Sequence, residues 1–409
     1  MRSIAAILSP ISLLLLAFFP LALQLPAEEG GDNFRIGKMG VDLRGNLTHT
    51  YDSNIGQSPD NANADWITSV GLLLTGEMVL TEINTLRLSI GAEYRKYWYN
   101  PEFDSNKNSL ILTPKTSLEL LAQAGNFDFR LYDDFSILSD PGDNRFIDPG
   151  SGALLTNIVL YNRIRNRLGV DSTWTINPYW NANAGIARVD IFPLDNEFQD
   201  LQRHSYVGSL GLSHNVAANL DVNGQVSGTV DRWRTGFQPD SSSWSVGAGA
   251  DWRPTDLIEC QAFLAWTNRR FGYDDTNPTG TLHSAGLTGN LAVTHQLNPE
   301  LQHSIRYGRS IDLGTASNEV TNQFIEYRVD YSGFERSDIY GEIFWNQGVE
   351  SGFTGPESFD RWAFRAGLGY PLSQKLEFSI RIEHSFRDSN LAGRNYSRNT
   401  AALTLTYDF

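Results

Sequence analysis

Hydrophobic and polar residues alternate with a period of two along most of the chain. In the segment 86–95 every even position is apolar, and every odd position is polar, charged or glycine. The segments 244–252, 361–370 and 378–383 show the same alternation. Successive side chains of a β-strand point to opposite faces of the sheet. The pattern therefore predicts strands with one apolar face and one polar face.

Applied to the whole chain, the alternation predicts eighteen strands. Their expected ranges are 39–53, 65–80, 84–99, 107–122, 126–139, 157–176, 179–192, 203–216, 220–234, 243–253, 257–271, 282–297, 301–314, 319–334, 339–349, 358–372, 376–388 and 395–409. Every second connection between strands is short and rich in Asn, Asp and Pro, as at 177–178 and 298–300. The connections between these are longer. We expect an all-β, antiparallel, up-and-down transmembrane β-barrel of about 18 strands, with 16 as the alternative.

The aromatic residues support a membrane location for this barrel. The chain has 10 Trp, 16 Tyr and 22 Phe, and many of them, including Trp66, Trp98, Trp180 and Trp244, fall near predicted strand ends. Aromatic side chains gather at membrane interfaces. A soluble β-sandwich or propeller, which also carries aromatic residues at its edges, remains the alternative, although no repeat of propeller-blade length is present.

The first 27 residues resemble an export signal. Arg2 is their only charge, and an apolar run extends from Ile4 to Leu25. Cleavage after Ala27 fits this pattern, with Ala22 as an alternative; a retained membrane anchor is the competing interpretation. The expected organisation is a signal peptide (1–27), a short periplasmic segment (28–38) and the barrel (39–409). An even number of strands places both termini at the short-turn rim, which is periplasmic in bacterial outer-membrane barrels.

Charge and cysteine content narrow the possible functions. The formal net charge of −15 argues against nucleic acid as a partner. The only cysteine, Cys260, permits neither an internal disulfide nor a cysteine-based zinc site. The seven histidines fall in no nucleophile or metal motif, so we expect no enzymatic activity, no cofactor and no metal. The acidic loop 140–156 does not have the spacing of an EF-hand, and it either folds into the lumen or covers the rim.

The polar face of the strands is the predicted lining of the lumen. Arg163, Arg165 and Arg167 have one parity on one strand, so they form a row that points one way. This row either guides anionic, carboxylated solutes or pairs with carboxylates on neighbouring strands and braces the wall. The other lumen-lining candidates are Arg87, Glu93, Arg95, Arg361, Arg365, Arg381 and Glu383.

Two segments resemble known barrel families. The last strand carries Leu403, Leu405, Tyr407 and the terminal Phe409 on one face, and it resembles the closing strand that the barrel-assembly machinery of the outer membrane reads as a signal. The segment 40–55, with Tyr51, Asp52 and Asn54, is similar to the start of β-barrel porins associated with exopolysaccharide loci. These resemblances imply a location in the outer membrane better than they imply a substrate.

The expected function is passive diffusion of small hydrophilic solutes through the lumen. The alternatives are an exporter barrel for a secreted polysaccharide, which needs polysaccharide-export proteins as partners, and a structural or surface-binding barrel with a blocked lumen. Outer-membrane lipid, lipopolysaccharide and the barrel-assembly machinery are the other expected partners.

Overall fold

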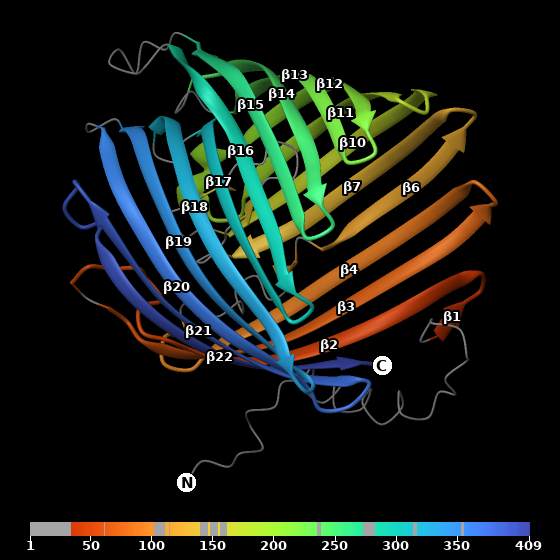
Figure 1. Cartoon of the computed structure of the whole chain (residues 1–409). Coiled ribbons are helices and arrows are strands. Elements are labelled where there is room, and N and C mark those ends of the chain that lie inside the picture. Colours follow the sequence, from red (N-terminus) through yellow and green to blue (C-terminus); the bar gives the residue numbers. More distant parts are fainter. Residues whose placement is uncertain are drawn as a thin grey trace.

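A computed structural model gives the fold of the chain (Figure 1). It describes residues 34–60, 62–101, 111–113, 115–139, 146–147, 154–155, 162–234, 239–272, 283–313, 317–352 and 356–409. The predicted signal peptide and most of the loop 140–156 lie outside these residues. Within the described ranges, no helix is both long and apolar enough to cross a membrane.

Long antiparallel strands make up nearly all of the described chain. The elements are β1 (Phe34–Ile36), β2 (Met39–Asp52), β3 (Asp65–Thr81), β4 (Asn84–Tyr97), β5 (Ile111–Leu112), β6 (Ser117–Ala124), β7 (Phe127–Ser139), β8 (Phe146–Ile147), β9 (Leu154–Leu155), β10 (Asn162–Asn177), β11 (Trp180–Pro193), the 3₁₀ helix η4 (Asn196–Leu201), β12 (Arg203–Ala217), β13 (Leu220–Trp233), β14 (Ser241–Thr255), β15 (Ile258–Phe271), β16 (His283–Asn298), β17 (Leu301–Asp312), β18 (Ser317–Phe334), β19 (Ser337–Gly352), β20 (Glu357–Pro371), β21 (Leu376–Ser389) and β22 (Tyr396–Asp408).

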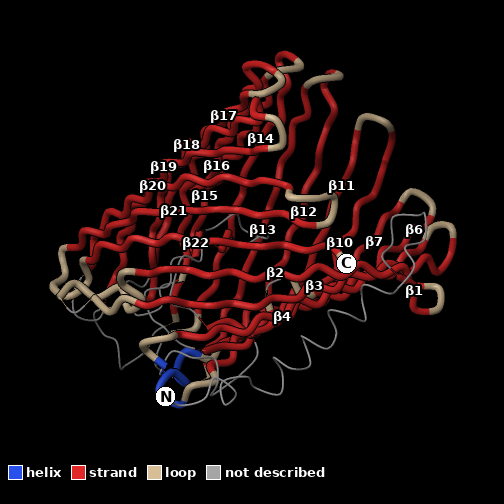
Figure 2. The backbone as a smooth tube through the Cα atoms, turned by 90° about the horizontal axis from the view of Figure 1, so that it is seen from below, coloured by secondary structure: helices blue, strands red, loops and turns tan. Residues whose placement is uncertain are grey.

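The strands close into a barrel, as the views in Figures 1 and 2 show. Each long strand pairs with its neighbours in sequence, and β2 pairs with β22 from Arg44–Asp408 to Asp52–Thr400. Since β5 and β6 both pair with β4, they occupy one position in the wall. The barrel therefore has the eighteen strands that the alternation predicts. Among the described residues, β8 and β9 form a separate two-stranded sheet.

The turns at the short-connection rim follow the predicted chemistry. The side-chain oxygen of Asn177 accepts hydrogen bonds from the backbone N–H groups of Tyr179 (2.9 Å) and Trp180 (3.1 Å). Asn298 accepts bonds from Glu300 and Leu301 in the same way, both at 2.9 Å. An Asn side chain that bonds the backbone two residues later stabilises a tight turn. β2 begins and β22 ends at this same rim.

Two differences from the predicted strands lie in the barrel sheet itself. The strand expected at 107–122 is interrupted between β5 and β6, where Pro114 falls, and proline has no N–H for a sheet ladder. Thr116 compensates, because its Oγ1 accepts a bond from the Gly91 N–H and donates one to the Gly91 carbonyl, both at 3.1 Å. The second difference is β1, which lies in the predicted periplasmic segment and pairs with the start of β2.

The two faces of the wall differ as the alternation requires. Leu210, Val226, Val246 and Trp266 are directly opposite one another across β12–β15 and are 48–66% exposed. Exposed apolar side chains in such contiguous rows are suited to contact with lipid. The other parity carries the charged and small polar residues, and it forms the inner face of the closed wall.

Inward-facing glycines receive aromatic side chains from the adjacent strand. A Cβ at position 308 would lie 2.3 Å from the ring of Phe324, and one at position 348 would lie 2.1 Å from the ring of Phe359. Phe324 packs in turn against Phe344, which is only 1% exposed. These two glycines therefore allow aromatic rings to lie flat against the inner wall.

We expect Gly308→Val to lower the free energy of unfolding by about 1–3 kcal/mol, because the added side chain overlaps the Phe324 ring. Urea denaturation of the refolded barrel, followed by Trp fluorescence, measures this change. The double variant Gly308→Val/Phe324→Ala should regain part of the loss. Equal unfolding midpoints for wild type and Gly308→Val would contradict the packing.

Candidate functional site

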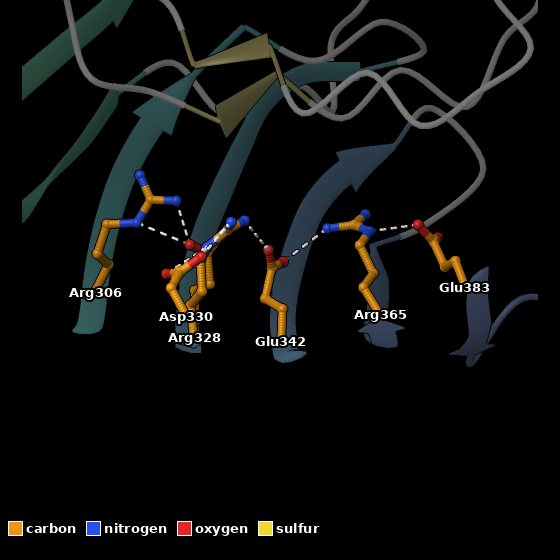
Figure 3. Close-up of polar contacts among 7 residues, drawn as sticks. Arg306, Arg328, Asp330, Glu342, Arg365 and Glu383 are labelled. Carbon is orange, nitrogen blue, oxygen red and sulfur yellow. Dashed lines mark hydrogen bonds and ion pairs between the residues drawn. The ribbon is translucent and has the colours of Figure 1, made fainter. Parts of the chain in front are cut away.

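A continuous row of charged side chains crosses the inner face of five adjacent strands, β17 to β21. We call it the inner ladder, and it consists of Arg306, Glu326, Arg328, Asp330, Glu342, Arg365 and Glu383 (Figure 3).

The strand register places opposite charges side by side in the inner ladder. Arg328 on β18 is directly opposite Glu342 on β19, which is opposite Arg365 on β20. Arg365 is opposite Glu383 on β21 in the same way. Directly opposed residues of an antiparallel pair have their Cβ atoms about 5 Å apart, so their side chains can pair.

Five of the seven side chains form one network of ion pairs, and Arg306 pairs with Glu326 at the β17 end of the ladder. Arg365 Nη1 lies 2.8 Å from Glu342 Oε1, and the Nε of the same guanidinium donates to Glu383. Arg328 contacts Asp330 at 2.6 Å and Glu342 at 3.7 Å. Arg365 thus bridges two carboxylates, and Glu342 bridges two arginines.

The inner ladder is buried over β19–β21, whereas its β17 end is exposed. The side chains of Glu342 and Arg365 are 7% exposed and that of Glu383 is 3% exposed, whereas Arg306 at the β17 end is 45% exposed. Buried charges are tolerated when they are paired, and removing one partner leaves the others with an uncompensated cost. We therefore expect the buried part of the inner ladder to brace the wall.

The arginine row of β10 lies on the opposite wall. In the strand order of the closed barrel, β10 is the sixth wall position and β19 the fifteenth, so eight of the eighteen strands lie between them on either side. Arg163, Arg165 and Arg167 have the inward parity, while Leu168 and Val170 of the outward parity are 51% and 37% exposed.

A buried tyrosine on β7 lies beside this row. The Tyr132 ring is 2% exposed and has the guanidinium carbons of Arg130 and Arg167 at 4.2 and 5.6 Å from its centroid. An arginine over an aromatic face gains a cation–π attraction. Arg130 also pairs with Glu119 at 2.5 Å and Asp171 at 3.3 Å. Cationic and acidic side chains thus share this wall too.

The remaining lumen-lining candidates lie on the inner face by the same parity. Arg87 pairs with Glu77 at 2.8 Å, and Arg95 pairs with Glu93 at 2.5 Å. Arg361 is 8% exposed and is directly opposite Arg387. Arg381 is exposed and is opposite Gly367.

The lining candidates named from the sequence include Arg365 and Glu383 of the inner ladder, but neither Arg306 nor Glu342. Both have the polar parity of their strands, so the alternation that located the other lining residues also contained the signal for these. Only the register shows that Glu342 lies between two arginines.

The described residues contain no group of three or more His, Cys, Asp or Glu side chains placed to hold a metal ion. The acidic residues of the loop 140–156 fall outside the described part of the chain. Leu403, Leu405 and Tyr407 have the outward parity of β22, and the terminal Phe409 contacts Tyr407 edge to face at 5.0 Å.

No protein-family model and no curated protein matches the chain. Solved structures do resemble it over 90–91% of its length. They include OccK2 (OpdF) of Pseudomonas aeruginosa in complex with glucuronate (TM-score 0.54, 10% identity, 99% of that chain covered) and the outer membrane protein OpdK of the same organism (0.52, 12%, 99%). OccAB3 of Acinetobacter baumannii is a third (0.51, 12%, 100%). The chain has the fold of an outer-membrane porin. At these identities, the likeness concerns the porin fold alone.

We expect Arg365→Gln to lower the free energy of unfolding by about 3–5 kcal/mol, because Glu342 and Glu383 would remain as buried carboxylates without their shared partner. The matched control is Arg253→Gln, which removes an ion pair with Glu259 in which the arginine is 71% exposed. That change should cost less than about 1 kcal/mol. Equal shifts of the urea midpoint in the two variants would contradict a bracing role for the inner ladder.

Proposed function

We propose that the protein is a passive pore of the bacterial outer membrane through which small hydrophilic solutes diffuse. The observation that carries this proposal is the division of the closed barrel into an exposed apolar outer face and a charged inner face. A barrel of sixteen to eighteen strands is wide enough for an aqueous channel. Charged walls keep such a channel hydrated, and solutes then move down their gradients without energy coupling.

The distribution of charge extends the proposal to the class of solute. The inner ladder is a mixture of arginines and carboxylates that largely satisfy one another. The row Arg163–Arg165–Arg167 places three guanidiniums at successive inward positions of one strand. Guanidinium groups bind carboxylates with good geometry, so we propose that this row favours anionic, carboxylated solutes. The structure of OccK2 holds glucuronate, a carboxylated sugar, which makes sugar acids the first solutes to test.

The proposed orientation follows from the unequal rims. Outer-membrane barrels have short turns on the periplasmic side and longer loops outside, so both ends of the barrel sequence, 39 and 409, would be periplasmic. We also propose that Leu403, Leu405, Tyr407 and Phe409 form the signal for the barrel-assembly machinery.

An exporter for a secreted polysaccharide is the second proposal, and it rests on the similarity of the segment 40–55 to porins of exopolysaccharide loci. Two residues of that segment have a structural role of their own. Asp52 accepts bonds from the buried Arg398 across the β2–β22 closure, with a contact of 2.6 Å, and from the Asn54 N–H at 2.9 Å. Asp52 therefore has a role in closing this barrel that does not depend on export, and polysaccharide-synthesis genes beside this gene would be needed to favour export.

Single-channel recording in a planar bilayer tests the passive pore. Refolded protein should give steady conductance, and a salt gradient should show preference for anions. The variant Arg163→Gln/Arg165→Gln/Arg167→Gln should lose that preference and keep its conductance. Folded barrels without conductance would contradict the proposal and favour a gated exporter or a blocked lumen.

We expect deletion of Phe409 to lower the amount of folded barrel in outer-membrane fractions, because the assembly signal loses its terminal aromatic ring. Heat-dependent migration on SDS gels distinguishes folded from unfolded barrel. Phe409→Tyr, which keeps a ring, is the control. Unchanged folded protein after the deletion would show that this ring is not part of the signal.

A further inference from the structure

Basic side chains gather on the outer face of β11–β16 at the long-loop rim. We call them the outer basic patch, and it consists of Arg188, His204, Arg232, Arg270 and His283. The register connects them, because His204 is directly opposite Arg232, and Arg270 is directly opposite His283. Each has the parity of the exposed apolar residues on its strand. The patch therefore faces outward, away from the lumen.

Exposed aromatic and apolar residues lie beside the patch and below it on the same face. Tyr206, opposite Arg188, is 50% exposed, and Trp244 is 45% exposed. The next row toward the short-turn rim holds Leu210, Val246 and Trp266, which are also exposed. In a membrane, aromatic side chains lie at the interface and apolar ones in the hydrocarbon. The patch would then lie at the level of the lipid headgroups.

The patch retains basic groups that can bind an anion. Arg188 and His204 share Asp190 at 2.9 and 2.5 Å, and Arg232 contacts Asp240 at 3.1 Å. The structure gives Arg270, which is exposed, no ion pair with any residue that it describes. The guanidiniums of Arg188 and Arg232 are accessible as well, since their side chains are 47% and 56% exposed.

Another part of the outer wall has the reverse charge at the same rim. On β20 and β21 the outward residues Asp360 and Asp388 are directly opposite each other. The whole chain carries a net charge of −15. The basic residues of β11–β16 are therefore a local feature and do not reflect the overall composition.

We propose that the outer basic patch binds the phosphate groups of a phosphorylated glycolipid of the outer leaflet, the lipid A part of lipopolysaccharide. The proposal rests on the outer-membrane location proposed above. The position of the patch points to this ligand. The exposed arginines can contact the phosphates of one lipid while the nearby aromatic and apolar side chains contact its acyl chains. Arginine binds phosphate through two parallel hydrogen bonds, and the nearby hydrocarbon strengthens the attraction.

Lipid titration of the folded barrel in detergent tests the proposal, with bound lipid counted by native mass spectrometry. The probes are bis-phosphorylated lipid A and the same lipid without phosphates. We expect the wild type to prefer the phosphorylated form. The variant Arg188→Gln/Arg232→Gln/Arg270→Gln should bind it more weakly, by about fivefold for each arginine removed.

The matched control is Arg44→Gln/Arg87→Gln/Arg253→Gln, which removes the same charge from three exposed arginines of the inward parity. This control should bind lipid A as the wild type does. If both triple variants bound lipid A equally weakly, the loss would be an effect of net charge, and the proposal would be overturned. Equal binding of the two lipids, or displacement of lipid A by millimolar inorganic phosphate, would also overturn it.

The proposed pore and the proposed lipid site can be contradicted independently of each other. Conductance of the patch variant should equal that of the wild type, because its substitutions lie on the outer face. A barrel that binds lipid A through the patch but does not conduct would contradict the proposed pore and still support the lipid site. A conducting barrel that shows no preference for phosphorylated lipid would do the opposite.

Discussion

The pairing of β2 with β22 is the interaction on which the rest of the structure depends. In a bilayer core no water is available for backbone groups, and each unsatisfied N–H or C=O costs several kcal/mol. An open sheet of this length would leave a whole strand edge unpaired on each side. Closure removes both edges, from the Arg44–Asp408 pair to the Asp52–Thr400 pair. The buried contact between Asp52 and Arg398 lies at the long-loop end of this closure.

Closure also places the two faces of the sheet in different environments, with lipid outside and water in the lumen. In every strand, side chains of one parity face lipid and those of the other face the lumen. Along the middle of a strand, a charged side chain is therefore tolerated on the lumen face alone. The inner ladder shows this on the inner face, where the nearly buried side chains of Glu342, Arg365 and Glu383 pair with one another. On the outer face of β11–β16 the arginines are confined to the long-loop end of the strands, beside Tyr206 and above Trp244.

Much of this arrangement can be predicted from the sequence, because the alternation has a period of two and the turns carry Asn, Asp and Pro. Most strand bounds agree with the predicted ranges within three residues, and the ten predicted lining residues have the inward parity. The cross-strand partners could not be predicted in the same way. Whether Glu342 meets Arg328 and Arg365 depends on the length of each turn and on the stagger of the strands, which no single strand encodes. The break before β6 was foreseeable from Pro114, whereas β1 has too few residues for a visible alternation.

Adjacent residues of one strand face lipid and lumen in turn. Cysteine scanning of 222–229 on β13, in a Cys260→Ala background, tests it directly, because this strand segment carries no charge. Each cysteine receives a fluorophore, and a quencher attached to lipid acyl chains is added to the reconstituted barrel. Strong quenching at even positions and weak quenching at odd positions is the predicted result. Uniform quenching, or a period other than two, would contradict the account.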